Sequence, residues 1–186
     1  KDYSGFHIAA SHSDSPTLKI KESSEMNIEN QYVKLNVEKY GGMLCAPWFD
    51  RPLSVAGRII VKDGNRLTTK LINVDRDLLM IPNLAIHMNR EVNDGYKYNI
   101  QKDMLPLYRM SNSGKAFKEM IAEEAGVSVD QIKGMDLFLY NRMEGTVWGC
   151  DGEFISAPRL DDLQCAFTST MALLNSESDR CIPVVA

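Results

Sequence analysis

Residues 6–16 read Phe-His-Ile-Ala-Ala-Ser-His-Ser-Asp-Ser-Pro, and the interpretation of the whole chain starts from this stretch. The apolar run 6–10 predicts a buried strand, and the polar turn after it carries His12 and Asp14. A neutral imidazole is a good zinc ligand, and a nearby carboxylate either accepts the proton of the other ring nitrogen or reaches the metal. A metal site at the carboxyl end of a strand is typical of α/β proteins. A loop histidine hydrogen-bonded to a neighbouring aspartate would give the same pattern.

Composition excludes several classes of protein. The net charge is −4 and there is no basic block, so nucleic acid is not expected as a partner. No apolar run approaches the length of a membrane span, so no membrane partner is expected either. The four cysteines are far apart and form no C-x-x-C pair, which argues against a structural zinc knuckle and a disulfide framework. We therefore expect free thiols and a cytoplasmic protein.

Hydrophobic periodicity predicts a chain that is β-rich in its middle and α/β at its two ends. The pattern predicts strands at 18–28, 31–38, 53–62, 66–74, 136–140 and 181–186, and helices at 113–125 and 160–174. Asp63-Gly64-Asn65 predicts a hairpin turn, and Gly126 is expected to end the first helix. The predicted fold class is α/β, with a catalytic unit formed by 1–21 and 151–186 and interrupted by an inserted β-rich domain at 22–150.

Two adjacent carboxylates, Asp161 and Asp162, open the second predicted helix. Aspartates favour the first helical turn because they cap it and complement its dipole, and one aspartate is enough for that purpose. A carboxylate can also bridge two metal ions, and paired metals activate water and polarise a carbonyl. An inserted domain would allow Asp161 to lie beside His12 in space.

Four segments, in order along the chain, give these residues a specific context. They are Ser11-His12-Ser13-Asp14-Ser15-Pro16; Tyr40-Gly41-Gly42 with Trp48-Phe49-Asp50-Arg51, Leu53-Ser54 and Ala56-Gly57-Arg58; Ile81-Pro82-Asn83-Leu84-Ala85-Ile86-His87 with Asn89-Arg90; and Glu153-Phe154-Ile155-Ser156 with Arg159-Leu160-Asp161-Asp162. In these segments the chain resembles the aspartyl aminopeptidase family of co-catalytic zinc metalloaminopeptidases.

The resemblance implies a role for each matching residue. His12 corresponds to a zinc ligand, Asp14 to the aspartate that orients that histidine, and Asp161 to the carboxylate that bridges two zinc ions. Asp162 stands where the family often has asparagine, so it is not counted as a ligand. Histidine and carboxylate ligands also suit Co²⁺ or Mn²⁺.

His87 is implied to reach the active site of a neighbouring subunit and to help hold the substrate, although a histidine of a core or interface would look the same. The inserted β-rich domain is implied to mediate dimerisation, with dimers building a dodecamer. The implied substrates are peptides with a free N-terminus, from which an acidic or a neutral residue is released.

The family's adjacent glutamates, one the general base and one a ligand, are expected after the strand that begins at Cys181, beyond the end of this sequence. Since the chain also begins without Met, we expect a fragment that lacks the N-terminal region and the C-terminal part of the catalytic domain, and that alone binds zinc weakly and is inactive. Two alternatives remain open: a related metallohydrolase such as a deacylase, and a non-catalytic oligomerisation fragment.

Overall fold

The computed structural model describes residues 3–186 and divides into two compact units. Unit 1 combines the segment up to Ser15 with Glu144–Ala186, and unit 2 is Pro16–Met143. The sequence placed the corresponding boundaries at 21/22 and 150/151. The strand that follows Pro16 runs through Ile28 and pairs with a unit 2 strand at both ends, over 17–20 and 25–28, so it belongs to unit 2 as a whole.

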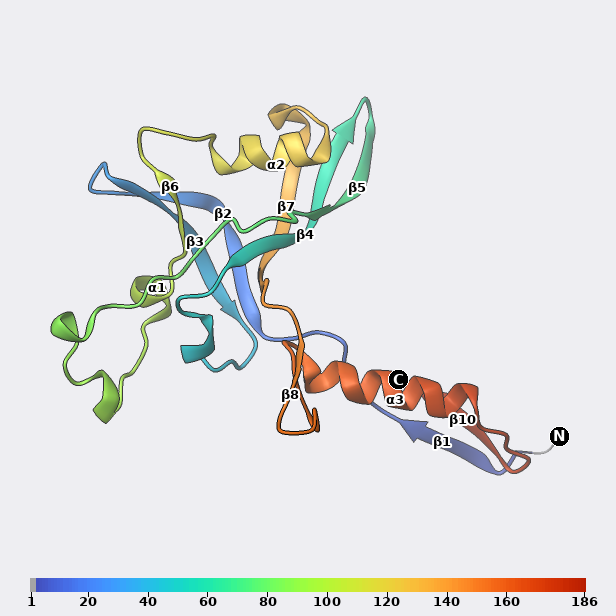
Figure 1. The fold of residues 1–186 in the computed structure, drawn as a ribbon. Helices are drawn as coiled ribbons and strands as arrows, with labels where there is room; N and C mark the ends of the chain where they lie inside the picture. Colours follow the sequence, from blue (N-terminus) through green and yellow to red (C-terminus); the bar gives the residue numbers. More distant parts are fainter. Residues whose placement is uncertain (1–2) are drawn as a thin grey trace. The chain divides into compact units, whose positions relative to one another are not determined.

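Unit 2 is built on one antiparallel sheet of six strands in the order β5-β4-β7-β2-β3-β6 (Figure 1). Its strands are β2 Thr17–Ile28, β3 Tyr32–Tyr40, β4 Leu53–Asp63, β5 Arg66–Asn73, β6 Leu107–Met110 and β7 Ile132–Asn141. The alternating patterns at 31–38, 53–62 and 66–74 are thereby confirmed as strands, and β4 and β5 form the predicted hairpin. In β3, alternation puts Val33, Leu35 and Val37 into the core, whereas β5, at the edge of the sheet, buries only Ile72.

Two helices and four three-residue 3-10 turns complete unit 2. The helices are α1 Ile100–Asp103 and α2 Phe117–Ala125, and the turns are Ala46–Trp48, Ile86–Met88, Val92–Asp94 and Val129–Gln131. Helix α2 buries Phe117, Met120 and Ile121 in the core and ends at Gly126, whose φ of 62° is the left-handed conformation that glycine adopts without strain. The predicted helix therefore exists and ends as expected, but it begins at 117 instead of 113.

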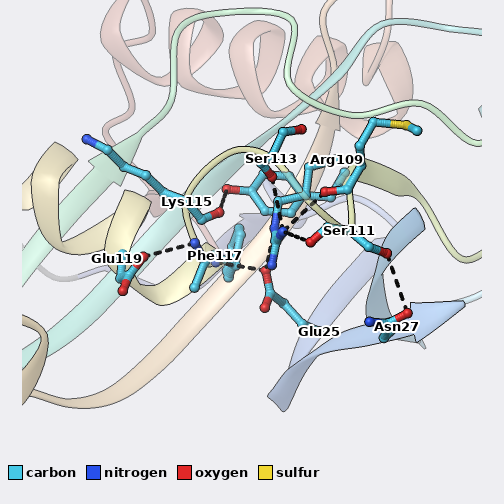
Figure 2. Close-up of polar contacts among 11 residues, drawn as sticks. Glu25, Asn27, Arg109, Ser111, Ser113, Lys115, Phe117 and Glu119 are labelled. Atoms are coloured by element: carbon cyan, nitrogen blue, oxygen red, sulfur yellow. Dashed lines mark hydrogen bonds and ion pairs between the residues drawn. The ribbon is translucent and has the colours of Figure 1, made fainter. Parts of the chain in front are cut away.

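The late start of α2 follows from a polar network around Arg109 (Figure 2). Its Nη1 donates at 3.1–3.3 Å to the carbonyl oxygens of Met110, Ser111 and Ser113. Glu25 Oε1 lies 3.4 Å from Arg109 Nε and accepts the backbone N–H of Phe117 at 3.0 Å. Residues 111–114 are thus folded around a guanidinium group, and the Glu25 carboxylate satisfies a free N–H of the first helical turn.

Unit 1 contains a parallel strand pair, a hairpin and one helix. Strand β1 Gly5–Ala9 pairs in parallel with β10 Cys181–Val185, α3 Leu160–Leu174 lies between them in sequence, and β8 Thr146–Trp148 pairs with β9 Phe154–Ser156. A parallel pair with an intervening helix is the α/β arrangement expected from the sequence. In the described part of the chain, no helix is long and apolar enough to cross a membrane.

Within residues 3–186, β1 is exposed and not buried as the sequence predicts. Phe6 is 65% exposed and Ile8 is 66% exposed. Two strands and one helix give these side chains too few neighbours to exclude water. All buried apolar side chains of residues 3–186 belong to unit 2, and none of the described side chains of unit 1 is buried.

Candidate metal centre

The candidate site lies in unit 1, at the carboxyl end of β1. The backbone after β1 is held to the end of β10, because Ala186 donates to the Ala9 carbonyl and Ser11 donates to the Ala186 carbonyl, each at 3.0 Å. His12 follows directly. On the other side of the site, Arg159 adopts a left-handed conformation with φ of 65° and leads into the first turn of α3, which carries Asp161. Strand pairing thus brings together residues that are far apart in sequence.

The His12 ring lies between two carboxylates. Its Nδ1 is 2.9 Å from the Asp14 carbonyl oxygen and 3.3 Å from Asp14 Oδ1, and its Nε2 is 3.4 Å from Asp161 Oδ1. A carbonyl oxygen only accepts, so Nδ1 carries the proton and the neutral ring presents the lone pair of Nε2 toward Asp161. The same Asp14 carbonyl is the main cause that raises the pKa of His12, since it stabilises the protonated ring.

This pair of donors fits a shared zinc ion. Nitrogen and oxygen ligands about 2.0–2.2 Å from a tetrahedral zinc are roughly 3.4 Å apart. The separation of His12 Nε2 and Asp161 Oδ1, 3.4 Å, matches that value. Among residues 3–186, no group of three or more histidine, cysteine, aspartate or glutamate side chains is placed to hold a metal. The described chain therefore supplies two donors, both of them substantially exposed.

Asp162 has a different environment. Its Oδ2 accepts the backbone N–H of His12 at 3.1 Å, so it ties the loop after β1 to the first turn of α3. The Cys165 thiol donates to the same carboxylate, and this hydrogen bond, followed by that from His12, lowers the pKa of Asp162. The sequence reasoning left Asp162 out of the ligand set and did not connect it with Cys165. The three-residue spacing on a helix was the available indication, since such side chains are neighbours.

The remaining predicted site residue, His87, belongs to unit 2. It lies in the 3-10 turn Ile86–Met88, in a segment where Leu84, Ile86 and Met88 are also exposed. Its side chain is exposed, so His87 is not a core histidine of unit 2. Of the predicted site residues, the structure brings together His12, Asp14 and Asp161 within unit 1.

A histidine and a carboxylate that converge at the carboxyl end of a parallel strand place the chain among α/β proteins built to hold a metal there. A family model described as aminopeptidase I zinc metalloprotease (M18) matches residues 1–186. The chain belongs to this M18 aminopeptidase family.

Individual relatives agree with this assignment. A probable M18 family aminopeptidase 2 from Clostridium acetobutylicum is 47% identical over 98% of this chain and 43% of its own length. The solved structure of mApe1 from Chaetomium thermophilum is 34% identical, with a TM-score of 0.81 over 97% of this chain and 45% of that one. The structure of the S. cerevisiae mApe1 dodecamer is 26% identical, with a TM-score of 0.73 over 97% of this chain and 42% of that one.

The chain therefore spans less than half the length of the curated and solved relatives that it matches. The family resemblance drawn from the four sequence segments is confirmed, as is the α/β fold class.

Proposed function

We propose that the protein containing this chain is a metalloaminopeptidase that releases N-terminal residues from peptides with a free amino terminus. One observation carries the proposal: His12 Nε2 and Asp161 Oδ1 converge at 3.4 Å in a member of the M18 family. The family resemblance implies that these two residues are a zinc ligand and a bridging carboxylate. Zinc is the metal named in the description of the family.

The described residues have distinct tasks in this reaction. His12 and Asp161 hold the metal. Asp14 fixes the tautomer and orientation of His12 by accepting a hydrogen bond from its Nδ1–H. Asp162 holds the backbone of His12 against the start of α3. A pair of zinc ions bound here would lower the pKa of water toward neutrality and polarise the peptide carbonyl. We take Zn²⁺ as the metal, with Co²⁺ or Mn²⁺ as substitutes that the same ligand types accept.

His87 is proposed to act on substrate in a neighbouring subunit. Its exposure on a projecting segment of unit 2, beside the exposed Leu84, Ile86 and Met88, supports contact with another copy of the chain. The proposed assembly is a homo-oligomer in which unit 2 mediates dimerisation. The relative from S. cerevisiae, solved as a dodecamer, supports a homo-oligomer, and we propose that dimers are its building units. Four unpaired cysteines agree with a cytoplasmic, reducing location.

The test compares the full-length protein with its Asp161→Asn variant on unblocked aminoacyl substrates with acidic and neutral first residues, in the presence of zinc, cobalt or manganese. We expect cleavage by the wild type and a loss of at least about a hundredfold in the variant, since a ligand is removed. The exposed Asp151 lies in the same unit, and Asp151→Asn is the matched control that should keep activity. A folded wild type that cleaves no substrate, or an Asp161→Asn variant as active as the control, refutes the proposal.

A further inference from the structure

The segment 82–95, which carries His87, leaves the core of unit 2 at a well-defined point. Ile81 is fully buried, and its carbonyl accepts the backbone N–H of Asp50 at 3.0 Å. The next residue is Pro82, whose ring fixes its φ. The chain therefore enters the segment from a fixed position and with restricted backbone freedom.

Beyond Pro82, the side chains of 82–95 are exposed except for the half-buried Asn89 and Val92. Leu84 is 58% exposed and Met88 is 76% exposed. Within residues 3–186, the hydrogen bond that ties 82–95 to the rest of unit 2 runs from the backbone N–H of Asn83 to Asp50 Oδ1, at 2.9 Å. The Asp50 carboxylate thus helps to fix the direction in which the segment leaves the core at its start.

Local hydrogen bonds carry this constraint from Asn83 to His87. The Asn83 side chain accepts the backbone N–H of Leu84 at 2.9 Å, and the Met88 N–H donates to the Ala85 carbonyl at 2.8 Å to close the 3-10 turn around His87. Each step is short, so a change in the orientation of Asn83 changes the position of the His87 ring.

The conformation of Asp50 is adapted to this contact. Its φ of 55° is left-handed, a region that aspartate and asparagine tolerate better than most residues, and Phe49 before it is buried. A core residue therefore anchors Asp50 on one side while its carboxylate reaches the segment on the other.

We propose that Asp50 is a positioning residue that holds the His87 segment in the orientation needed for substrate binding. The inference rests on the proposed role of His87. Asp50 acts through the Asn83 N–H and touches neither substrate nor metal.

The test is a double-mutant cycle in the full-length protein. Asp50→Gly removes the acceptor and keeps the left-handed backbone free of strain, whereas Asp50→Asn keeps an acceptor oxygen at the same place. We expect Asp50→Gly to raise KM about tenfold with little change in kcat, and Asp50→Asn to restore KM to near the wild-type value. His87→Ala should raise KM by at least as much as Asp50→Gly, and the double variant should be no worse than His87→Ala alone.

The outcomes separate the two hypotheses. If His87→Ala leaves KM and kcat unchanged, the proposed role of His87 fails and the role of Asp50 fails with it. If His87→Ala is impaired while Asp50→Gly has wild-type kinetics, or while the two effects multiply in the double variant, only the inference about Asp50 is overturned. Unfolding midpoints and zinc content of each variant show whether folding is retained. If Asp50→Gly does not fold, Asp50→Ser, whose hydroxyl does not reproduce the carboxylate acceptor, takes its place in the cycle.

Discussion

Gly57, in the middle of β4, is the position at which the structure predicts the sharpest effect of a single methyl group. Its φ is +151°, and it pairs with Leu137 in β7. A Cβ atom built on Gly57 would lie 2.2 Å from the Asp136 carbonyl oxygen and 3.0 Å from the Leu137 Cα. Both obstacles are backbone atoms of a neighbouring strand, so no side-chain rotation can relieve them.

The expected cost of Gly57→Ala has two parts. Carbon and oxygen atoms in sheets approach to about 3.3 Å, so the new methyl overlaps the carbonyl by about 1 Å, and overpacking of this kind costs about 1–3 kcal/mol. A backbone conformation reserved for glycine adds about 1–3 kcal/mol. The sum, about 2–6 kcal/mol, is a large fraction of the stability of a typical domain.

Equilibrium chemical unfolding of the purified protein, followed by the fluorescence of Trp48 in unit 2, measures this cost. Two alanine variants serve as controls. Gly64 has a φ of +58° with nothing near its Cβ position, so Gly64→Ala should cost only about 1–2 kcal/mol. Gly42 has open space and no positive φ, so Gly42→Ala should be close to neutral. A Gly57→Ala variant no less stable than Gly64→Ala would refute the reasoning.

Three further predictions concern other parts of the molecule. Arg109→Met removes the donors around which 111–117 folds and should cost about 1–3 kcal/mol of stability and speed amide exchange there, whereas Lys118→Met should do neither. The hydrogen bond from Lys19 lowers the pKa of Asp136 in the folded protein. The Asp136 carboxylate therefore stabilises the fold at pH values above its unfolded-state pKa, and this contribution is lost as the pH falls through its lower folded-state pKa. Unfolding titrations should therefore show a loss of stability below about pH 4 that is smaller in Asp136→Asn; an identical pH profile would contradict this assignment. In a polypeptide of these 186 residues, hydrogen exchange should be slow in β4 and β7 and fast in β8 and β9, because burial is confined to unit 2; equal protection would count against this account.

Local patterns were sufficient for most elements of the fold. Alternation predicted β3, β4 and β5, and the Asp63-Gly64-Asn65 turn predicted the hairpin of β4 with β5. Gly126 marked the end of α2. The start of α2 was predicted too early because it depends on a contact between Arg109 and Glu25. These two residues are 84 positions apart in the sequence. No local pattern indicates that the Arg109 guanidinium group binds the carbonyl oxygens of Met110, Ser111 and Ser113.

The candidate site shows the same division. The spacing of His12 and Asp14 was enough to predict that they lie together, since two residues in one turn are close in any conformation. The contact of His12 with Asp162 was missed, because the backbone N–H of His12 is bound by a carboxylate 150 positions away. The exposure of β1 was also missed, since an apolar pattern shows which face avoids water but not whether other segments cover it.

The folding of unit 1 is expected to depend on the folding of unit 2. Unit 1 is interrupted by all of unit 2, and none of its residues that the structure describes is buried, so the pairing of β1 with β10 closes a very long loop for little apolar gain. Closing that loop is less costly once unit 2, which has its own core, has folded into a compact body. The convergence of His12 and Asp161 should therefore follow the folding of unit 2.

Gly57→Ala, in the sheet of unit 2, should then weaken zinc binding in proportion to the unfolded fraction, whereas His12→Ala should abolish zinc binding and leave the unfolding of unit 2 unchanged. Zinc affinity that stays at the wild-type level while the core of unit 2 is unfolded would show that unit 1 assembles its donors independently.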